Sequence, residues 1–223
     1  MNKKIFIACD TRNITKVKKI IKQSNTKKLK IGYKFGLEFF NSKNGRNFIS
    51  KIKNKIIFAD LKLHDIPNTC ISAVKAIKDL KVKYLTIHIS SGLDALKAVK
   101  KISGKIKIVG VSTLTSLNNE KLKQTGHTRS IKNLVMYQAK LAKKANLDAL
   151  VCSAHEVAYV KKIFKKEIIT PGIRFSGDKA IDQKRIMTPK KAFENGATSI
   201  VIGRSITQGN INNNIKRLIK SLN

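Results

Sequence analysis

The sequence predicts an α/β protein, and more narrowly a closed (β/α)8 barrel that occupies residues 1–223 as one domain. Short runs rich in Ile and Val alternate with longer segments of helical spacing, which is the rhythm of βαβ units and a parallel sheet. We count eight such runs, and polar residues gather where they end. Eight units in one chain of this length favour closure into a barrel, for which roughly 200 residues are enough.

The expected strands are short segments in which Ile, Val, Leu and aromatic residues fill most positions, as in strands that are covered on both faces. In chain order they are 4–9, 30–35, 56–61, 84–89, 106–112, 149–153, 168–172 and 199–203. Their lengths are typical of strands in globular proteins.

Between these runs lie amphipathic segments, in which apolar residues recur every three or four positions as on one face of a helix. We expect helices at 14–22, 69–80, 92–100, 131–145 and 188–195. A final helix is expected at the end of the chain, where one helical face carries Ile211, Ile215, Leu218, Ile219 and Leu222.

A doubly wound open sheet is the alternative for the same rhythm of strands and helices. It is disfavoured because the first expected strand ends at Ala8-Cys9-Asp10, without the Gly-x-Gly-x-x-Gly turn that binds dinucleotides in such folds. The sequence also lacks a P-loop, a low-complexity linker and a short-period repeat.

The bulk composition is that of a globular protein, with 42% apolar and 27% charged residues. No run approaches the ~18 apolar residues of a membrane span, so we expect a soluble, cytoplasmic protein without a membrane partner. Cys9, Cys70 and Cys152 form no close pair, which favours reduced, mostly buried thiols. The histidines are too scattered to suggest a metal site.

The formal net charge of +34 raises the possibility of a nucleic-acid-binding protein, since a basic surface attracts polyanions. However, the lysines are spread along the whole chain, and no aromatic residues are interleaved with them to stack on bases. Lys, Ile and Asn, all abundant here, share A/T-rich codons. We therefore expect no specific nucleic-acid partner.

The most informative stretch is 58–69, which places charged groups where an apolar strand is ending. If 56–62 is extended, the two-residue alternation puts Asp60 and Lys62 on the same face as two apolar neighbours, Ile56 and Phe58. A buried unpaired charge costs roughly several kcal/mol, so these groups must pair with each other, with Asp65, or with a charged ligand. A structural ion pair that caps a barrel is the alternative to a catalytic group.

Polar residues also follow the other expected strands, at the end of a barrel where active sites form. They are Asp10, Lys34, His88, Thr113, Thr115 and Ser116, together with Pro171-Gly172-Ile173-Arg174 and Gly203-Arg204-Ser205. Several cations beside glycines suit a phosphorylated ligand, and the loops after strands 7 and 8 are a frequent phosphate site in this fold. His88 is interpreted as structural.

The segment 60–69, Asp-Leu-Lys-Leu-His-Asp-Ile-Pro-Asn-Thr, resembles the Asp-x-Lys-x-x-Asp-Ile-Pro-Asn-Thr motif of the orotidine 5′-monophosphate decarboxylase family. The resemblance covers nearly the whole chain. Supporting matches are Asp10, Lys34, 114–116, 171–174, 182–185 with 188–189, and 203–207, and each falls in the strand order that the family requires.

This resemblance implies decarboxylation of orotidine 5′-monophosphate to uridine 5′-monophosphate in pyrimidine synthesis, without a metal or other cofactor. The implied transition state has vinyl-carbanion character. Lys62 is the implied proton donor, and Asp60 is implied to lie against the substrate carboxylate. Together with Lys34 and Asp65 they form an array of alternating charge, whose preorganised field would stabilise the transition state.

The resemblance also implies a set of substrate-binding residues and a homodimer. Asp65 and Thr69 are implied to reach into the neighbouring subunit's site, so that two sites are shared. The implied substrate-binding residues are Asp10, Lys34, Ile66, Thr69, Thr115, Ser116, Arg174, Gln183, Gly203 and Arg204.

A related barrel enzyme that decarboxylates or synthesises sugar phosphates with Mg²⁺ is the closest alternative, but Ile-Pro-Asn-Thr after Asp65 argues against it. The chain departs from the orotidylate pattern in two ways. It has few acidic residues, and Ala145-Asn146 stands before the sixth strand where a glycine-containing turn is common. Both departures lie outside the motifs.

Overall fold

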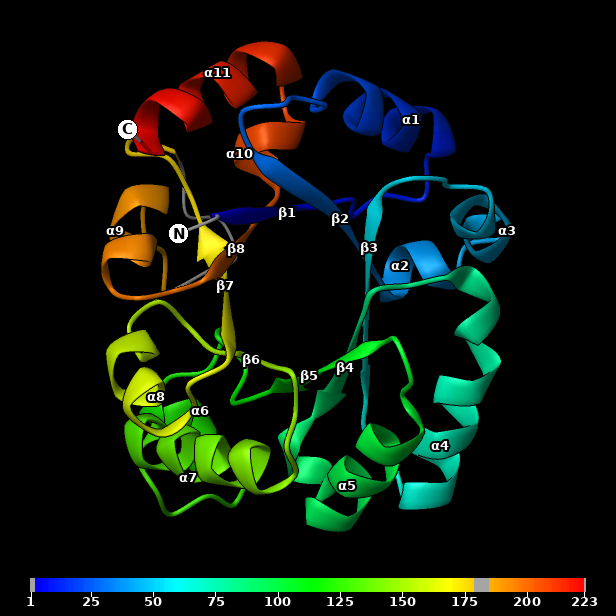
Figure 1. The fold of residues 1–223 in the computed structure, drawn as a ribbon. Helices are drawn as coiled ribbons and strands as arrows, with labels where there is room; N and C mark the ends of the chain where they lie inside the picture. The colour runs from blue at the N-terminus through cyan, green and yellow to red at the C-terminus, as the bar shows by residue number, and fades with distance from the viewer. Residues whose placement is uncertain (1–2, 179–184, 223) are drawn as a thin grey trace.

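The computed structural model describes residues 3–178 and 185–222, and it contains a closed barrel of parallel strands. Each strand pairs with the next along the chain, and β8 pairs with β1 to close the barrel (Figure 1). The predicted fold class is therefore confirmed. The strands are β1 Lys4–Ala8, β2 Lys30–Gly36, β3 Ile56–Leu63, β4 Tyr84–His88, β5 Lys107–Val111, β6 Ala149–Val151, β7 Glu167–Ile173 and β8 Ser199–Ile202.

Helices surround the barrel as an outer ring (Figure 1). The helices over the segments predicted from periodicity are α1 Ile14–Gln23, α4 Pro67–Ala76, α5 Leu93–Ile102, α7 Ile131–Lys144, α9 Pro189–Glu194 and α11 Ile211–Leu222. Further elements are α2 Leu37–Phe40, α3 Gly45–Ser50, α6 Asn119–Lys123, α8 Val157–Ile163 and α10 Arg204–Thr207, with 3-10 turns η1 Lys78–Leu80 and η2 Ile89–Ser91. These were not predicted because they are too short to display a helical period.

Side-chain caps explain where several helices begin. The side chains of Asn13, Asn118, Ser130 and Thr188 each accept a hydrogen bond from a backbone N–H in the first turn of α1, α6, α7 and α9. Such caps satisfy donors that have no partner within the helix.

The barrel interior is filled by aromatic side chains beneath its C-terminal mouth. The rings of Phe6 and Phe58 have centroids 4.9 Å apart, and Phe6 and Tyr84 are 5.1 Å apart. Gly32 on β2 makes room for this packing, because a Cβ there would lie 2.8 Å from the Phe6 ring. A second and larger apolar layer lies between the barrel and the helices. The aromatic floor gives the mouth above it a fixed, dry base.

A polar cluster closes the opposite, N-terminal end of the barrel around the carboxylate of Glu167. Lys4 Nζ and Ser199 Oγ each lie 2.7 Å from Glu167 Oε1, and Tyr84 Oη and Lys107 Nζ lie 3.0 and 3.3 Å from Oε2. Burial raises the pKa of Glu167, but the hydrogen bonds from Lys4 and Ser199 and the nearby lysine charges outweigh it, so the pKa is lowered. We call these five residues the basal cluster.

The turn before β6 shows how the missing glycine is accommodated. Asn146 has a φ of 56°, in the left-handed region that favours glycine. Asparagine is one of the few other residues that adopt this conformation readily, so the departure noted from the sequence leaves the turn intact.

Two predictions drawn from the composition, on membrane spans and on the cysteines, can be compared with the described residues. No helix among them is long and apolar enough to cross a membrane. Cys9, Cys70 and Cys152 are all free and buried, as predicted, and burial raises the pKa of each thiol.

Candidate active site

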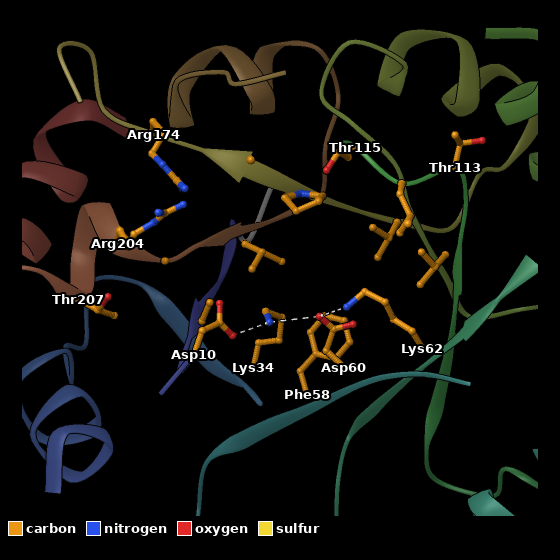
Figure 2. A pocket seen from close by; sticks show the side chains of 18 residues that line it. Asp10, Lys34, Phe58, Asp60, Lys62, Thr113, Thr115, Arg174, Arg204 and Thr207 are labelled. Atoms are coloured by element: carbon orange, nitrogen blue, oxygen red, sulfur yellow. Dashed lines mark hydrogen bonds and ion pairs between the residues drawn. The ribbon is translucent and has the colours of Figure 1, made fainter. Parts of the chain in front are cut away.

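A cavity of about 460 Å³ opens at the C-terminal mouth of the barrel, above the aromatic floor. Its charged lining residues come from five places in the fold: Asp10 follows β1, Lys34 lies in β2, Asp60 and Lys62 lie in β3, Arg174 follows β7, and Arg204 begins α10 (Figure 2). Parallel strands bring their carboxyl ends to the same mouth, which explains why residues so distant in sequence meet here.

Four of these side chains form a continuous chain of alternating charge. Lys34 Nζ lies 3.1 Å from Asp10 Oδ1 and 3.2 Å from Asp60 Oδ2, and Lys62 Nζ lies 2.9 Å from the same Asp60 oxygen (Figure 2). Asp60 is buried, and the side chain of Lys34 is largely buried too, with 12% of it exposed. We call Asp10, Lys34, Asp60 and Lys62 the charged row.

Mutual pairing keeps the buried members of the charged row ionised. Burial raises the pKa of Asp60, but the charges of Lys34 and Lys62 outweigh it, so the pKa lies below its ordinary value. Burial lowers the pKa of Lys34, but Asp60 and Asp10 outweigh it, so that pKa is raised. Both groups are therefore charged at neutral pH, and the field they create is present before any ligand binds.

Lys62 reaches the cavity through an irregular backbone. Phe58, Asp60 and Lys62 all line the cavity, as the alternation predicted. However, Lys62 has a φ of 49°, and the register between β3 and β4 shifts between Ala59 and Leu63. This is a β-bulge, a feature found often beside active sites because it re-aims a side chain.

Two arginines lie across the cavity from the charged row. The guanidinium groups of Arg174 and Arg204 point toward each other in Figure 2. Arg174 is buried, and its NH1 donates to the carbonyl of Ile173 at 2.9 Å. Burial and the charge of Arg204 lower its pKa. Two cations beside Gly172 and Gly203 form a place where an anion such as a phosphate is favoured.

The structure brings together eight of the residues predicted for the site, which line the cavity. They are Asp10, Lys34, Asp60, Lys62, Thr115, Arg174, Gly203 and Arg204. Asp65, Ile66, Thr69 and Ser116 are exposed and stand outside this cavity's described lining. Gln183 lies outside the described residues.

Several lining residues were not predicted from the sequence. Ala8, Val111, Val151 and Val201 come from inward positions of the strands. Leu114 and Thr207 belong to segments that match the family, but neither was assigned to the site. The strand alternation that placed Asp60 on the inner face also applies to these strands, but an apolar side chain does not indicate a chemical role.

His88 lies outside the described lining of the cavity. Its ring lies 5.1 Å from that of His64. Burial and the charges of His64 and Lys62 lower the pKa of His88.

Thr86 on β4 was also missed. It is fully buried, and its hydroxyl lies 2.7 Å from the backbone nitrogen of Lys62 and 3.2 Å from Asp60 Oδ1. Thr86 lies two residues before His88 and therefore on the same face of β4. In the sequence, this spacing is the only indication that Thr86 lies near the site.

The barrel, the charged row and the arginine pair at its mouth are the features of a (β/α)8 enzyme, and the two arginines suit an anionic ligand. The profile of the orotidine 5′-phosphate decarboxylase / HUMPS family matches residues 3–214, and the chain belongs to this family. The predicted membership is thus confirmed.

Individual relatives agree with this assignment. The chain is 45% identical to an orotidine 5′-phosphate decarboxylase of Wolbachia pipientis from Culex pipiens, over 98% of each chain. It is 42% identical to that of Carboxydothermus hydrogenoformans, over 92% of this chain and 90% of the other. The crystal structure of orotidine 5′-phosphate decarboxylase from Lactobacillus acidophilus has a TM-score of 0.83 and 30% identity, and 98% of each chain is covered.

Proposed function

We propose that this protein decarboxylates orotidine 5′-monophosphate to uridine 5′-monophosphate in de novo pyrimidine biosynthesis, and that it does so in the cytoplasm. The observation that carries the proposal is the charged row, in which Lys62 and Lys34 flank Asp60 within 3.2 Å. Family membership and the names of the relatives support the choice of substrate.

The substrate's phosphate binds between Arg174 and Arg204 beside Gly203, because guanidinium groups match phosphate oxygens in geometry and charge. The ribose lies against Asp10 and Lys34. The cavity connects these two regions, so a nucleotide can span it with its base directed toward Lys62. Thr115 lines the cavity and then lies by the pyrimidine, whereas Ser116 is exposed outside the described lining and would have to turn inward to join it. The role proposed for Gln183, which lies outside the described residues, is to join base and phosphate.

In the reaction, the bond between C6 of the pyrimidine and its carboxylate breaks. The electron pair remains on C6 while carbon dioxide leaves, and a proton from Lys62 Nζ then bonds to C6. Lys62 stabilises the developing charge before it donates the proton, and the fixed neighbours Asp60 and Lys34 supply a preorganised field. Asp60 stands close to the departing carboxylate, and its repulsion is relieved when carbon dioxide forms.

The donor set argues for a reaction that needs no divalent metal. Oδ2 of Asp60 already has two ammonium groups within 3.2 Å, those of Lys34 and Lys62. Like-charge repulsion from these ammonium groups disfavours a cation such as Mg²⁺ at the same oxygen. No group of three or more His, Cys, Asp or Glu suited to a metal occurs in the part of the chain that the structure describes.

The decisive assay measures orotidine 5′-monophosphate consumption by the purified protein in excess EDTA. We expect full activity. Activity that disappears with EDTA and returns with Mg²⁺ would favour a sugar-phosphate enzyme of the same fold. Absence of turnover, together with DNA or RNA binding that falls steeply as salt is raised and is unchanged in Lys62→Ala, would favour a nucleic-acid-binding protein instead.

We further propose that the working unit is a homodimer with shared sites. Asp65, Ile66 and Thr69 belong to the family motif, yet all three are exposed, and Ile66 is 66% exposed. Leu37 and Leu114 are also exposed apolar residues, at 52% and 42%. An exposed motif that includes an apolar residue, together with further exposed apolar residues, fits a surface that a second copy covers.

Subunit mixing tests the shared sites. Asp65→Ala and Lys62→Ala should each be inactive alone. After mixing and exchange of subunits, hybrid dimers hold one intact site each, so about a quarter of wild-type activity should return. If both variants are inactive and mixing restores nothing while hybrid dimers are shown to form, Asp65 acts in its own subunit. If Asp65→Ala is active alone, Asp65 has no role in the reaction.

A further inference from the structure

The bulge in β3 leaves one residue of β4 opposite three residues of its neighbour. Ala59 pairs with Leu85 and Leu63 pairs with Ile87, so residues 60–62 of β3 lie opposite Thr86 alone. A bulge takes backbone groups out of the ladder, and a buried N–H without a partner costs stability. The backbone N–H of Lys62, at a φ of 49°, therefore needs a partner from outside the ladder.

The Thr86 hydroxyl supplies that partner. Its oxygen lies 2.7 Å from Lys62 N, and a backbone N–H can only donate, so the hydroxyl accepts this bond. The hydroxyl proton is then free to be donated to Asp60 Oδ1, which lies 3.2 Å away. Thr86 is fully buried, so water does not compete for either bond.

Both oxygens of the Asp60 carboxylate are therefore held. Thr86 holds Oδ1, whereas Lys34 and Lys62 hold Oδ2. A carboxylate held on one side only can rotate about its last side-chain bond. Fixing both oxygens sets the plane of the carboxylate and hence the direction from which it attracts the Lys62 ammonium group.

We propose that Thr86 is a positioning residue, whose single hydroxyl ties the left-handed backbone of Lys62 to the carboxylate of Asp60 and thereby aims the proton donor. It acts through Asp60 and Lys62, because it lies outside the described lining of the cavity. This inference rests on the proposed function, in which Lys62 donates the proton.

The test compares Thr86→Val, which keeps the shape but removes the hydroxyl, with Thr86→Ser, which keeps the hydroxyl. We expect Thr86→Val to lower kcat about 10- to 100-fold, the effect of losing one or two hydrogen bonds to a charged site. KM should change little because no substrate contact is lost. Thr86→Ser should retain kcat within about threefold.

Thr170→Val is the matched control. Thr170 on β7 is as deeply buried, but its hydroxyl has no hydrogen-bond partner among the described residues. Removing it tests the loss of a buried threonine hydroxyl from the barrel without touching the charged row. We expect wild-type kcat and KM for this variant.

The pH profile separates positioning from packing. Removing a donor from the Asp60 carboxylate raises its pKa, so the acid limb of kcat should move to higher pH in Thr86→Val and stay unchanged in Thr170→Val. The proposal is overturned if Thr86→Val keeps more than about a third of kcat. It is equally overturned if Thr86→Ser loses as much activity as Thr86→Val.

Hydrogen exchange tests the same geometry without any assay of turnover. The Lys62 amide should exchange slowly in the wild-type protein, because it donates to a buried hydroxyl. If that amide exchanges at the rate of a free one, the proposal fails, even if the protein is an active decarboxylase and even if Thr86→Val does not fold. If the wild-type protein has no decarboxylase activity but the amide is protected, the proposed function fails instead.

Discussion

Lys62 is held by three different kinds of contact, and each affects a different property of its ammonium group. The carboxylate of Asp60 attracts Nζ, the bulge sets the direction of the side chain, and the hydroxyl of Thr86 binds its backbone nitrogen. A residue fixed at both ends loses little further freedom when a ligand arrives, which is the condition for preorganised catalysis. The arginines across the cavity are held separately from this group, so binding and chemistry should respond to different substitutions.

Lys62→Ala should abolish nearly all turnover while the protein stays folded, because both the cation and the proton donor are lost. The measurement is kcat with orotidine 5′-monophosphate, with circular dichroism as the check on folding. Lys97→Ala, an exposed lysine on α5, is the matched control and should be fully active. Retention of more than about a tenth of the rate, a change of only ~1.4 kcal/mol in the barrier, contradicts the assigned role.

Arg204→Ala should mainly weaken capture of the phosphorylated substrate. Loss of a charge-assisted contact to phosphate is expected to raise KM by about 10- to 100-fold, as measured by initial rates over a range of substrate concentrations. Arg46→Ala removes an arginine that pairs with Asp79 and does not line the cavity, so its KM should match the wild type. An unchanged KM in Arg204→Ala places the phosphate elsewhere.

Two residues with a positive φ, Lys62 and Asn146, determine the course of the chain where they lie. The bulge in β3 at Lys62 serves the site, whereas Asn146 terminates α7 and leads the chain into β6. Both have a positive φ of about 50° to 60°, but only one of them has a hydrogen-bonded partner inside the barrel. The turn at Asn146 is therefore a structural requirement of the βαβ connection, and it can be changed without affecting chemistry.

Substitutions at Asn146 test this requirement. Asn146→Ala should destabilise the protein by about 1 kcal/mol relative to Asn146→Gly, because alanine is strained in the left-handed region and glycine is not. Both variants lose the side-chain amide that contacts Lys166, so their difference isolates the backbone. The measurement is urea unfolding at neutral pH. Equal stability of the two variants means that the turn does not need a positive φ.

Most of the secondary structure could be predicted because long amphipathic helices and buried strands leave a strong periodic signal. All eight strands were found within a few residues, and α1, α7 and α11 matched closely. The short helices of four to seven residues, such as α2 and α10, have too few positions for a helical period to appear.

In the site, Lys62 and Arg204 were predicted from their motifs. Thr86 was not, because its contacts with Lys62 and Asp60 depend on the register of β3 against β4.

For the molecule as a whole, the two ends of the barrel contain polar groups for different reasons. At the C-terminal mouth, the charged row faces an open cavity, while at the opposite end the basal cluster satisfies Glu167 with protein groups alone. Removing the charge of a largely buried carboxylate is strongly destabilising when lysines pair with it, since their charges are then left without a counter-charge. The basal cluster should therefore account for part of the change in the free energy of unfolding at acid pH.

The sign of this effect follows from the pKa of Glu167, which is lowered in the folded state from its ordinary value of 4.5. Its contribution to stability is thus present above about pH 4.5 and is lost as the pH falls through the folded pKa. Glu167→Gln should lower the free energy of unfolding at pH 7 by about 3 kcal/mol and should lose less stability than the wild type below pH 4.5.

Urea unfolding at a series of pH values is the measurement. Glu38→Gln is the control, because Glu38 is 53% exposed in its side chain and pairs loosely with Arg12 at 3.8 Å. That variant should follow the wild-type curve. If Glu167→Gln also runs parallel to the wild type at every pH, the basal cluster does not carry the acid-dependent stability.

The sequence by itself determined the barrel and the identity of the charged residues, because strand periodicity and the 60–69 motif are local properties of the chain. Only the tertiary structure decided which of those charges touch. It joined Asp10, Lys34, Asp60 and Lys62 into one row and left Asp65 and Thr69 outside the described lining of the cavity. The physical reason is that distances between side chains on different strands depend on barrel closure and on one bulge. Neither can be predicted from the sequence of a single segment.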